Sequence, residues 1–316
     1  MSAVTLPWPG LLRGPGGGPG ATTAPGTSTA PGTAAAGGTS TTGRLDALDT
    51  TLRSLGRVLV AFSGGADSAF VLAAAVRSLG AAAVTAATAV SPSLPGRELD
   101  GAAAFAAALA VEHLTPSTHE LARPGYAAND GDRCYHCKAE LVDVLSPLAR
   151  ERGAVVVTGT NADDLRAGFR PGIRAGFERG ARTPLADVGL TKAEIRSVSR
   201  DWGLATADKP AAACLSSRVA YGVAIDPARL ARVDAAEDVV RGALAAAGHP
   251  VGDVRVRDLG DTASVEVETA LVEVVAAMTD LLAEVRACGF SEAAVDPRGF
   301  RSGSMNELLT RPDRWR

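Results

Sequence analysis

The sequence is poor in aromatic residues, poor in cysteine and without a large excess of either charge. Aromatic side chains make up 4% of its 316 residues, and the formal net charge is −3. Because binding to nucleic acid by bulk electrostatics needs a clear basic excess, we expect no nucleic-acid partner. Four cysteines in a chain of this length are too few for a disulfide framework, and they favour a reducing, cytoplasmic location.

Long apolar runs and targeting signals are also missing. The longest candidate, residues 102–111, is short and rich in alanine, whereas a membrane helix needs roughly 18–20 apolar residues. The N-terminus has no basic segment followed by an apolar core, which a secretory signal would show. We therefore expect neither membrane association nor secretion.

The first 43 residues lack almost all charge and most large apolar side chains. They consist largely of Gly, Pro, Ala, Thr and Ser, and Arg13 is the only charged residue among them. Such a segment cannot bury enough apolar surface to offset the entropy lost on ordering. We expect residues 1–43 to form a disordered tail and ordered structure to begin near Leu45.

The rest of the chain shows the alternation of an α/β protein. Short apolar runs followed by turn residues predict strands over residues 57–62, 84–90 and 154–158. Helical periodicity and capping signals predict helices over residues 69–79, 97–111, 137–152 and 191–203. Strands that alternate with helices indicate a parallel sheet covered on both faces, which we assign to residues 44–222.

A second, smaller α/β domain is predicted over residues 223–316. Asp226 and Pro227 begin a helix that extends to about Ala247. The predicted elements that follow are strands at residues 254–257 and 264–267, a helix over residues 270–287 and a strand near Ala293.

A loop with the sequence SGGADS follows the first predicted strand and opens a helix. Gly64 and Gly65 let the backbone turn sharply and approach a phosphate, toward which the first helical amides point. Ser63 and Ser68 add hydroxyl donors, and Asp67 can cap the helix or help to hold the Mg²⁺ that accompanies ATP. The lysine of a Walker A loop is absent, so this is not a kinase-type P-loop. A glycine turn with ordinary helix caps is the alternative.

A second polar loop, GTNADD, follows the strand predicted at residues 154–158. Ligands of open α/β sheets collect outside the carboxyl ends of the strands, so we expect Gly159 and Asn161 to face the same crevice as the first loop. Asp163 is a candidate Mg²⁺ ligand. The competing interpretation is a simple helix cap.

Three of the four cysteines form a candidate site. Cys134 and Cys137 stand in a Cys-x-x-Cys pair, and Cys214 is followed four residues later by Arg218. A structural zinc site, a dithiol redox pair and a 4Fe–4S cluster on three thiolates with one iron open to sulfide are all compatible with this set. Cys214 alone is also a candidate nucleophile or sulfur donor, with Arg218 favouring its thiolate. Cys288, near a predicted helix end, is interpreted as a small buried residue.

The SGGADS loop resembles the SGGxDS signature of the PP-loop ATP pyrophosphatases, which transfer AMP and release pyrophosphate. Seven stretches together resemble the LarE family, the PP-loop sulfur transferases of nickel-pincer nucleotide synthesis. They are residues 60–68, 132–138, 159–164, 170–172, 214–218, 254–257 and 299–306. The resemblance covers about residues 45–307 in order. It implies a HUP-like nucleotide-binding domain, use of ATP and Mg²⁺, and assembly into a homo-oligomer.

The resemblance also implies a substrate and roles for individual residues. The substrate would be a pyridinium-3,5-dicarboxylic acid mononucleotide, whose carboxylates are adenylated and converted to thiocarboxylates. Members with three cysteines look like cluster enzymes that take sulfide from a donor, and the other members give up the sulfur of the cysteine that Cys214 matches. Because this chain has all three cysteines, the resemblance favours the form with a 4Fe–4S cluster on Cys134, Cys137 and Cys214, and a sacrificial Cys214 is the alternative. Glu237 matches a position at the substrate site. Arg255 and Arg257 alternate with valines, so both lie on one strand face and suit the substrate phosphate; a solvated strand face is the alternative.

Other functions on the same scaffold stay open. Ammonia-dependent amidation would use the nucleotide loop but gives the cysteines no task. A tRNA thiolase would be expected to have a more basic surface or an added RNA-binding module. A metal or redox sensor would use the cysteines but leaves the nucleotide loop unexplained.

Overall fold

The computed structural model describes residues 40–168, 170–210, 213–301 and 303–308, which belong to one compact unit. The larger part contains α1 (Thr41–Leu55), β1 (Val58–Ala61), α2 (Ala66–Leu79), η1 (Ala81–Ala83), β2 (Val84–Ala87), α3 (Gly96–Ala108), β3 (Glu112–Leu114), η2 (Glu120–Ala122), α4 (Pro124–Ala127), α5 (Arg133–Glu151), β4 (Val155–Val157), α6 (Ala162–Arg166), α7 (Pro171–Glu178), α8 (Pro184–Asp187) and α9 (Lys192–Asp201). The smaller part contains η3 (Leu215–Arg218), α10 (Pro227–Ala246), β5 (Val254–Asp258), β6 (Thr262–Val267), η4 (Thr269–Leu271), α11 (Val272–Ala277), α12 (Leu281–Ala287), β7 (Glu292–Val295) and η5 (Ser304–Leu308). The η elements are short 3-10 helices.

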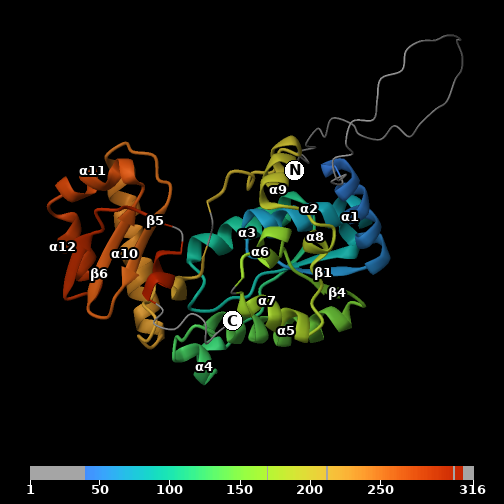
Figure 1. The fold of residues 1–316 in the computed structure, drawn as a ribbon, viewed down its shortest axis with the longest axis horizontal. Helices are drawn as coiled ribbons and strands as arrows, with labels where there is room; N and C mark the ends of the chain where they lie inside the picture. The colour runs from blue at the N-terminus through green and yellow to red at the C-terminus, as the bar shows by residue number, and fades with distance from the viewer. Residues whose placement is uncertain (1–39, 169, 211–212, 302, 309–316) are drawn as a thin grey trace, which may run out of the picture. The chain divides into compact units, whose positions relative to one another are not determined.

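The first sheet is parallel and buried on both faces, as predicted. Its described strands follow the order β3-β2-β1-β4. On β1, Val58 and Val60 pack into the core beneath α1, α2 and α9, while Leu59 packs on the opposite face against α5. Figure 1 shows α1 and α2 on one side of β1 and α5 on the other. The predicted α/β fold class is thus confirmed, and the carboxyl ends of β1 and β4 meet at one edge.

The second sheet has its own core. Its described strands follow the order β5-β6-β7, with β5 antiparallel and β7 parallel to β6. Val233 and Val240 of α10 pack with Val256 of β5 and Val265 of β6, and α11 and α12 complete this cluster (Figure 1). This confirms a small C-terminal α/β part, while the boundary predicted near residue 222 stays a prediction.

Several element bounds differ from the predicted ones. The helix α1 begins at Thr41, before the expected start of order near Leu45, and the rest of the predicted tail, residues 1–39, lies outside the described residues. The single helix predicted over residues 270–287 is wrong: α11 ends at Ala277 and α12 begins at Leu281, because Thr279 and Asp280 are poor helix-interior residues.

Two smaller differences between predicted and observed element bounds affect the site. The helix α5 begins at Arg133 rather than near Cys137, so both thiols of the Cys-x-x-Cys pair lie on its first turns. The strand β3 follows Val111 where the sequence predicted only the end of a helix.

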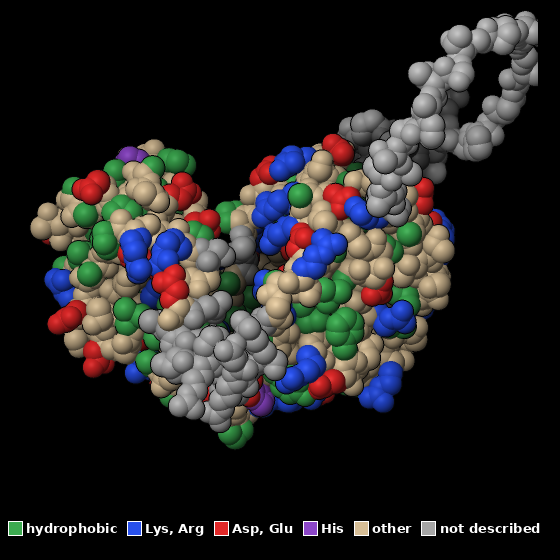
Figure 2. All heavy atoms as spheres, viewed as in Figure 1, with side chains coloured by type: hydrophobic (Ala, Val, Ile, Leu, Met, Phe, Trp, Pro, Cys, Tyr) green, Lys and Arg blue, Asp and Glu red, His purple; other side chains and the backbone are tan. Residues whose placement is uncertain are grey.

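The surface charge is mixed. On the face that Figure 2 shows, Lys and Arg side chains are interspersed with Asp and Glu. Among the described residues, no helix combines the length and the apolar character needed to cross a bilayer.

Candidate functional site

The nucleotide loop is held by its own serines. Gly64 adopts a positive φ of 71°, which glycine tolerates without strain, and Gly65 is the N-cap residue of α2. The Ser63 and Ser68 hydroxyls lie 3.1 Å apart, and the Ser68 hydroxyl donates to the Gly65 carbonyl at 3.0 Å. Asp67 lies in the first turn of α2, and a glycine rather than Asp67 caps the helix.

The second loop touches the first one closely enough to require glycine. A Cβ atom on Gly159 would lie 2.7 Å from the Ser68 nitrogen and 2.8 Å from the Asp67 carbonyl carbon. Both are backbone atoms that cannot move without disturbing α2. The carboxyl ends of β1 and β4 therefore bring the two loops together at one edge, as the sequence predicted.

A cavity of about 370 Å³, which we call the nucleotide cavity, opens between these loops. It is within the size range of small-molecule sites. Its lining includes Ser63, Gly65, Asp67 and Ser68 of the first loop. Four cationic side chains also line it: Lys138, Lys192, Arg196 and Lys209. Cations together with the N-terminus of α2 suit the phosphates of a nucleotide.

Asp67 has the properties expected of a Mg²⁺ ligand in this cavity. Its Oδ1 atom is buried and has no hydrogen-bond partner among the described residues. Burial raises the pKa of Asp67, and Lys192, whose Nζ lies 3.9 Å from Oδ2, opposes that rise. Asp164 lines the same cavity. Mg²⁺ in nucleotide sites commonly takes one or two carboxylates and completes its shell with phosphates and water, so these residues fit the ion.

The other predicted residues of the second loop face elsewhere. The Asn161 side chain caps α6 by accepting from the amides of Asp163 and Asp164 at 3.0 and 3.1 Å. The Asp163 carboxylate accepts from the Lys192 amide at 2.8 Å. Neither Asn161 nor Asp163 lines the nucleotide cavity, whereas Gly159 and Asp164 do. For Asn161 the helix-cap interpretation is the one observed.

Cys137 and Cys214 line a second cavity, which we call the thiol chamber. It has a volume of about 160 Å³ and shares Ser63 and Leu94 with the nucleotide cavity. Burial raises the pKa of Cys137, and the nearby Cys214 adds to the rise. Cys134 is exposed, one turn earlier on α5, and does not line the chamber.

The segment that carries Cys214 is fastened to the start of α5 and to α4. The buried Arg133 guanidinium donates to the Ser216 carbonyl at 2.9 Å. The buried Tyr126 hydroxyl lies 2.5 Å from the Ser216 hydroxyl and 2.6 Å from that of Ser93. These contacts fix η3, and with it the position of Cys214 relative to Cys137.

The thiols as placed do not form a ready metal site. Among the described residues, no three Cys, His, Asp or Glu side chains converge on one point closely enough to hold a metal ion. The three cysteines therefore do not form a ready site for a single metal ion in this arrangement, and we derive no step through a cluster. Use of a cluster stays a prediction.

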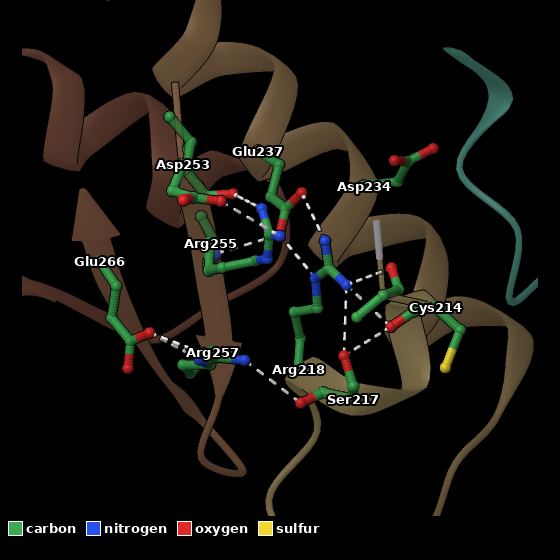
Figure 3. Close-up of polar contacts among 12 residues, drawn as sticks. Cys214, Ser217, Arg218, Asp234, Glu237, Asp253, Arg255, Arg257 and Glu266 are labelled. Atoms are coloured by element: carbon green, nitrogen blue, oxygen red, sulfur yellow. Dashed lines mark hydrogen bonds and ion pairs between the residues drawn. The ribbon is translucent and has the colours of Figure 1, made fainter. Parts of the chain in front are cut away.

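Arg218 contacts the backbone of Cys214 rather than its sulfur. Its Nη1 donates to the carbonyls of Ala213 and Cys214, the latter at 2.9 Å, and its Nε donates to Glu237 at 2.8 Å. Figure 3 shows the sulfur pointing away from the guanidinium. The expectation that Arg218 favours the Cys214 thiolate stays a prediction.

Glu237 is the centre of a buried ion-pair network. Its side chain has 0% exposure, and besides Arg218 it binds Arg97 of α3 at 2.7 Å. Burial alone would raise the pKa of Glu237, but Arg218, Arg255 and Arg97 outweigh it, so that the pKa lies below its usual value. Glu237 lines none of the cavities described here, so it acts on the arginines around it.

Arg255 and Arg257 lie on one face of β5 but have different surroundings. Arg257 pairs with Glu266 on β6 at 2.7 Å (Figure 3). Arg255 instead lines a third cavity of about 190 Å³. Burial lowers the pKa of Arg255 to about 10. Five cations line this cavity, which we call the arginine cavity: Arg97, Lys209, Arg218, Arg241 and Arg255.

The three cavities adjoin one another. The arginine cavity shares Lys209 and Pro210 with the nucleotide cavity, and Pro95, Glu98 and Ala213 with the thiol chamber. One ligand can therefore reach a nucleotide, a thiol and a cationic pocket at the same time.

Comparison with known proteins decides the family. No protein-family model matches the chain. The uncharacterized protein slr1717 of Synechocystis is 41% identical over 272 residues, which cover 85% of this chain and 98% of that protein. The pyridinium-3,5-bisthiocarboxylic acid mononucleotide synthase of Lactiplantibacillus plantarum is 32% identical over 265 residues, which cover 84% of this chain and 94% of that enzyme. The chain belongs to the LarE family.

Membership of the LarE family implies use of ATP and a nucleotide substrate. The uncharacterized protein MJ0830 of Methanocaldococcus jannaschii is similar over a shorter stretch, 27% identical over 175 residues, which cover 55% of this chain and 66% of that protein.

Several residues that line these cavities are not predicted by any sequence motif. Lys192, Arg196 and Lys209 belong to no nucleotide motif, and only the folded chain brings them to the cavity. Arg97 and Arg241 reach the arginine cavity from helices whose sequences gave no signal for it. Lys138 could have been suspected, because it directly follows the Cys-x-x-Cys pair.

Proposed function

We propose that this protein is an ATP-dependent sulfur transferase that acts on pyridinium-3,5-dicarboxylic acid mononucleotide. It adenylates the carboxylates of this substrate and converts them to thiocarboxylates. The observation that supports the proposal is that the two cavities adjoin: Cys214 lines a chamber that shares Ser63 and Leu94 with the nucleotide cavity. An acyl-adenylate formed in one cavity is therefore within reach of sulfur in the other.

In the first step, a substrate carboxylate oxygen attacks the α-phosphorus of ATP, and pyrophosphate leaves. The loop amides at the N-terminus of α2 and the cations Lys138, Lys192 and Lys209 stabilise the charge on the departing pyrophosphate. Asp67 and Asp164 would hold the Mg²⁺, which supplies further neutralisation of the phosphates. The arginine cavity binds the substrate phosphate through Arg255 and Arg241, with Glu237 positioning Arg218 and Arg97 beside them.

In the second step, the Cys214 sulfur attacks the acyl carbon, and AMP leaves as the C–S bond forms. Loss of the Cys214 Cα proton then breaks the Cβ–S bond, whose electron pair goes to the sulfur. The products are a thiocarboxylate and a dehydroalanine at position 214. A 4Fe–4S cluster on Cys134, Cys137 and Cys214 that carries sulfide is the alternative sulfur source, and no described contact yet favours it over the single cysteine.

The proposal is tested with Cys214→Ala. This variant should still release pyrophosphate when ATP and the substrate are present, but it should form no thiocarboxylate. Cys288→Ala is the matched control, because Cys288 lies at the end of α12 and lines none of the cavities described here, and it should perform both steps. Thiocarboxylate formation by Cys214→Ala would refute the role of this sulfur, and absence of pyrophosphate release from the parent protein would refute the adenylation.

The sulfur source is tested separately by mass and metal analysis. A sacrificial Cys214 predicts that intact protein loses one sulfur per transfer and then stops. A cluster predicts iron and sulfide in anaerobically purified protein, loss of both in Cys134→Ala, and continued turnover with added sulfide.

A further inference from the structure

The thiol chamber carries negative charge that the sulfur transfer does not use. Two carboxylates line it, Glu98 and Glu120, and its described lining contains no Lys or Arg. Glu98 is neutralised by Lys209, whose Nζ lies 2.7 Å from it. Glu120 forms no ion pair with any side chain in the described ranges.

Glu120 is nevertheless buried and held in a fixed orientation. It is 3% exposed at the start of η2, and its Oε1 accepts a hydrogen bond from the Ser91 hydroxyl at 2.5 Å. The same Ser91 oxygen accepts from the Ser93 amide at 3.2 Å. An ionised carboxylate that is buried without a cation is costly, unless a ligand supplies the opposite charge.

The chamber limits the kind of cation that would fit. Its walls include the apolar side chains of Ala89, Leu94, Pro95 and Leu141, which cannot replace the water shell of a small hard ion. No metal-binding set of three acidic, histidine or cysteine side chains is found in the described part of the chain. A flat organic cation with apolar faces suits both the walls and the single carboxylate.

We propose that Glu120 is the counter-ion of the substrate's pyridinium ring and selects a cationic ring over a neutral one. This inference rests on the proposed function, which gives the substrate such a ring. With the phosphate in the arginine cavity, the ring enters the adjoining chamber near Pro95 and Ala213. Glu120 repels the ring's carboxylates, which turns them toward Ser63 and the lysines of the nucleotide cavity.

The test compares two ligands in the parent protein and in Glu120→Gln. One ligand is pyridinium-3,5-dicarboxylic acid mononucleotide. The other is its analogue in which an uncharged benzene ring replaces the pyridinium ring, with the same ribose phosphate and carboxylates. Calorimetric titration without ATP should show that the parent prefers the pyridinium ligand by about tenfold or more, as expected when a buried charge loses its partner. Glu120→Gln should bind both ligands within about threefold of each other, since its side chain has the same shape without the charge.

Controls separate this inference from the proposed function. Glu112→Gln removes another hydroxyl-bonded carboxylate, on β3 and outside the three cavities, and should keep the full preference. Ser91→Ala should keep most of the preference, since it leaves the charge in place. Thermal unfolding checks that each variant is folded, and Glu120→Gln should melt at or above the parent temperature because a buried charge is gone.

Three results would overturn the assignment of Glu120. The first is that the parent protein shows no preference for the pyridinium ligand. The second is that the preference survives in Glu120→Gln. The third is that Glu120→Gln loses bound iron while it keeps the preference, which would make Glu120 a metal ligand. Pyrophosphate release by Glu120→Gln at saturating substrate would show that the protein performs the adenylation, whether or not Glu120 determines the ligand preference. If the parent binds neither ligand, the proposed function fails together with this inference.

Discussion

Removing the charge of Glu237 should destabilise the protein strongly. Glu237 is fully buried and is paired with Arg218, whose side chain is 2% exposed. Breaking a buried pair by neutralising one partner leaves an uncompensated charge and typically costs about 3–5 kcal/mol. For Glu237→Gln, which keeps the shape and part of the hydrogen bonding, we expect about 3 kcal/mol. In a chain of 316 residues that corresponds to a fall in melting temperature of roughly 5 °C.

The assay is thermal and urea denaturation of Glu237→Gln beside the double variant Arg218→Met/Glu237→Leu. Replacing both partners by apolar side chains of similar volume removes the unpaired charge of Arg218, while Arg97 keeps its pairs with Asp234 and Asp238, so the double variant should recover part of the lost stability. If Glu237→Gln stays within about 0.5 kcal/mol of the parent, it behaves like an ordinary surface substitution and the reasoning is refuted.

The dependence of this effect on pH follows from the lowered pKa of Glu237. A carboxyl whose pKa is lower in the folded state stabilises the fold at pH values above its unfolded pKa. That contribution is lost as the pH falls through the folded pKa. The stability gap between the parent and Glu237→Gln should therefore be full at pH 7 and shrink below the ordinary glutamate pKa of 4.5.

Two further predictions concern the nucleotide domain. Gly159→Ala should lower the melting temperature and weaken ATP binding, because its Cβ would lie 2.7 Å from the Ser68 nitrogen. As a control, Gly101→Ala adds a carbon in α3 that meets nothing within 4 Å. This variant should instead stabilise the helix by about 0.5–1 kcal/mol. An unchanged nucleotide affinity in Gly159→Ala would contradict the close contact of the loops. Burial raises the pKa of Glu194, but hydrogen bonds from Thr191, Thr41 and Arg44 outweigh this and lower the pKa to about 2. The ionised Glu194 should therefore stabilise the fold above pH 4.5, and this stabilisation should be lost as the pH falls toward 2. Urea midpoints measured over that range should fall less steeply in Glu194→Gln than in the parent, and parallel profiles would argue against it.

Sequence patterns predict those parts of the site that lie within one short segment of the chain. The SGGADS loop follows a buried strand and opens a helix, and that order alone fixes the position of Ser63 and Ser68 at the sheet edge. The partners of a charged side chain depend on tertiary packing instead. The resemblance assigns Arg257 to the phosphate together with Arg255. The antiparallel register of β5 and β6 places Glu266 opposite Arg255, from where it reaches diagonally to Arg257 and pairs with it at 2.7 Å. No periodicity in residues 254–257 contains that information.

The three cavities adjoin one another, and their charges match the three charged groups of the proposed substrate. The arginine cavity is cationic, the thiol chamber holds the unpaired carboxylate of Glu120, and the nucleotide cavity is cationic again. The substrate carries a phosphate, a positively charged ring and carboxylates. In a reversed molecule a carboxylate would occupy the arginine cavity, and the phosphate would stand in the nucleotide cavity in place of the acyl group that reacts with ATP. Under the proposed function, we therefore expect charge to favour the orientation in which Cys214 and the adenylate meet.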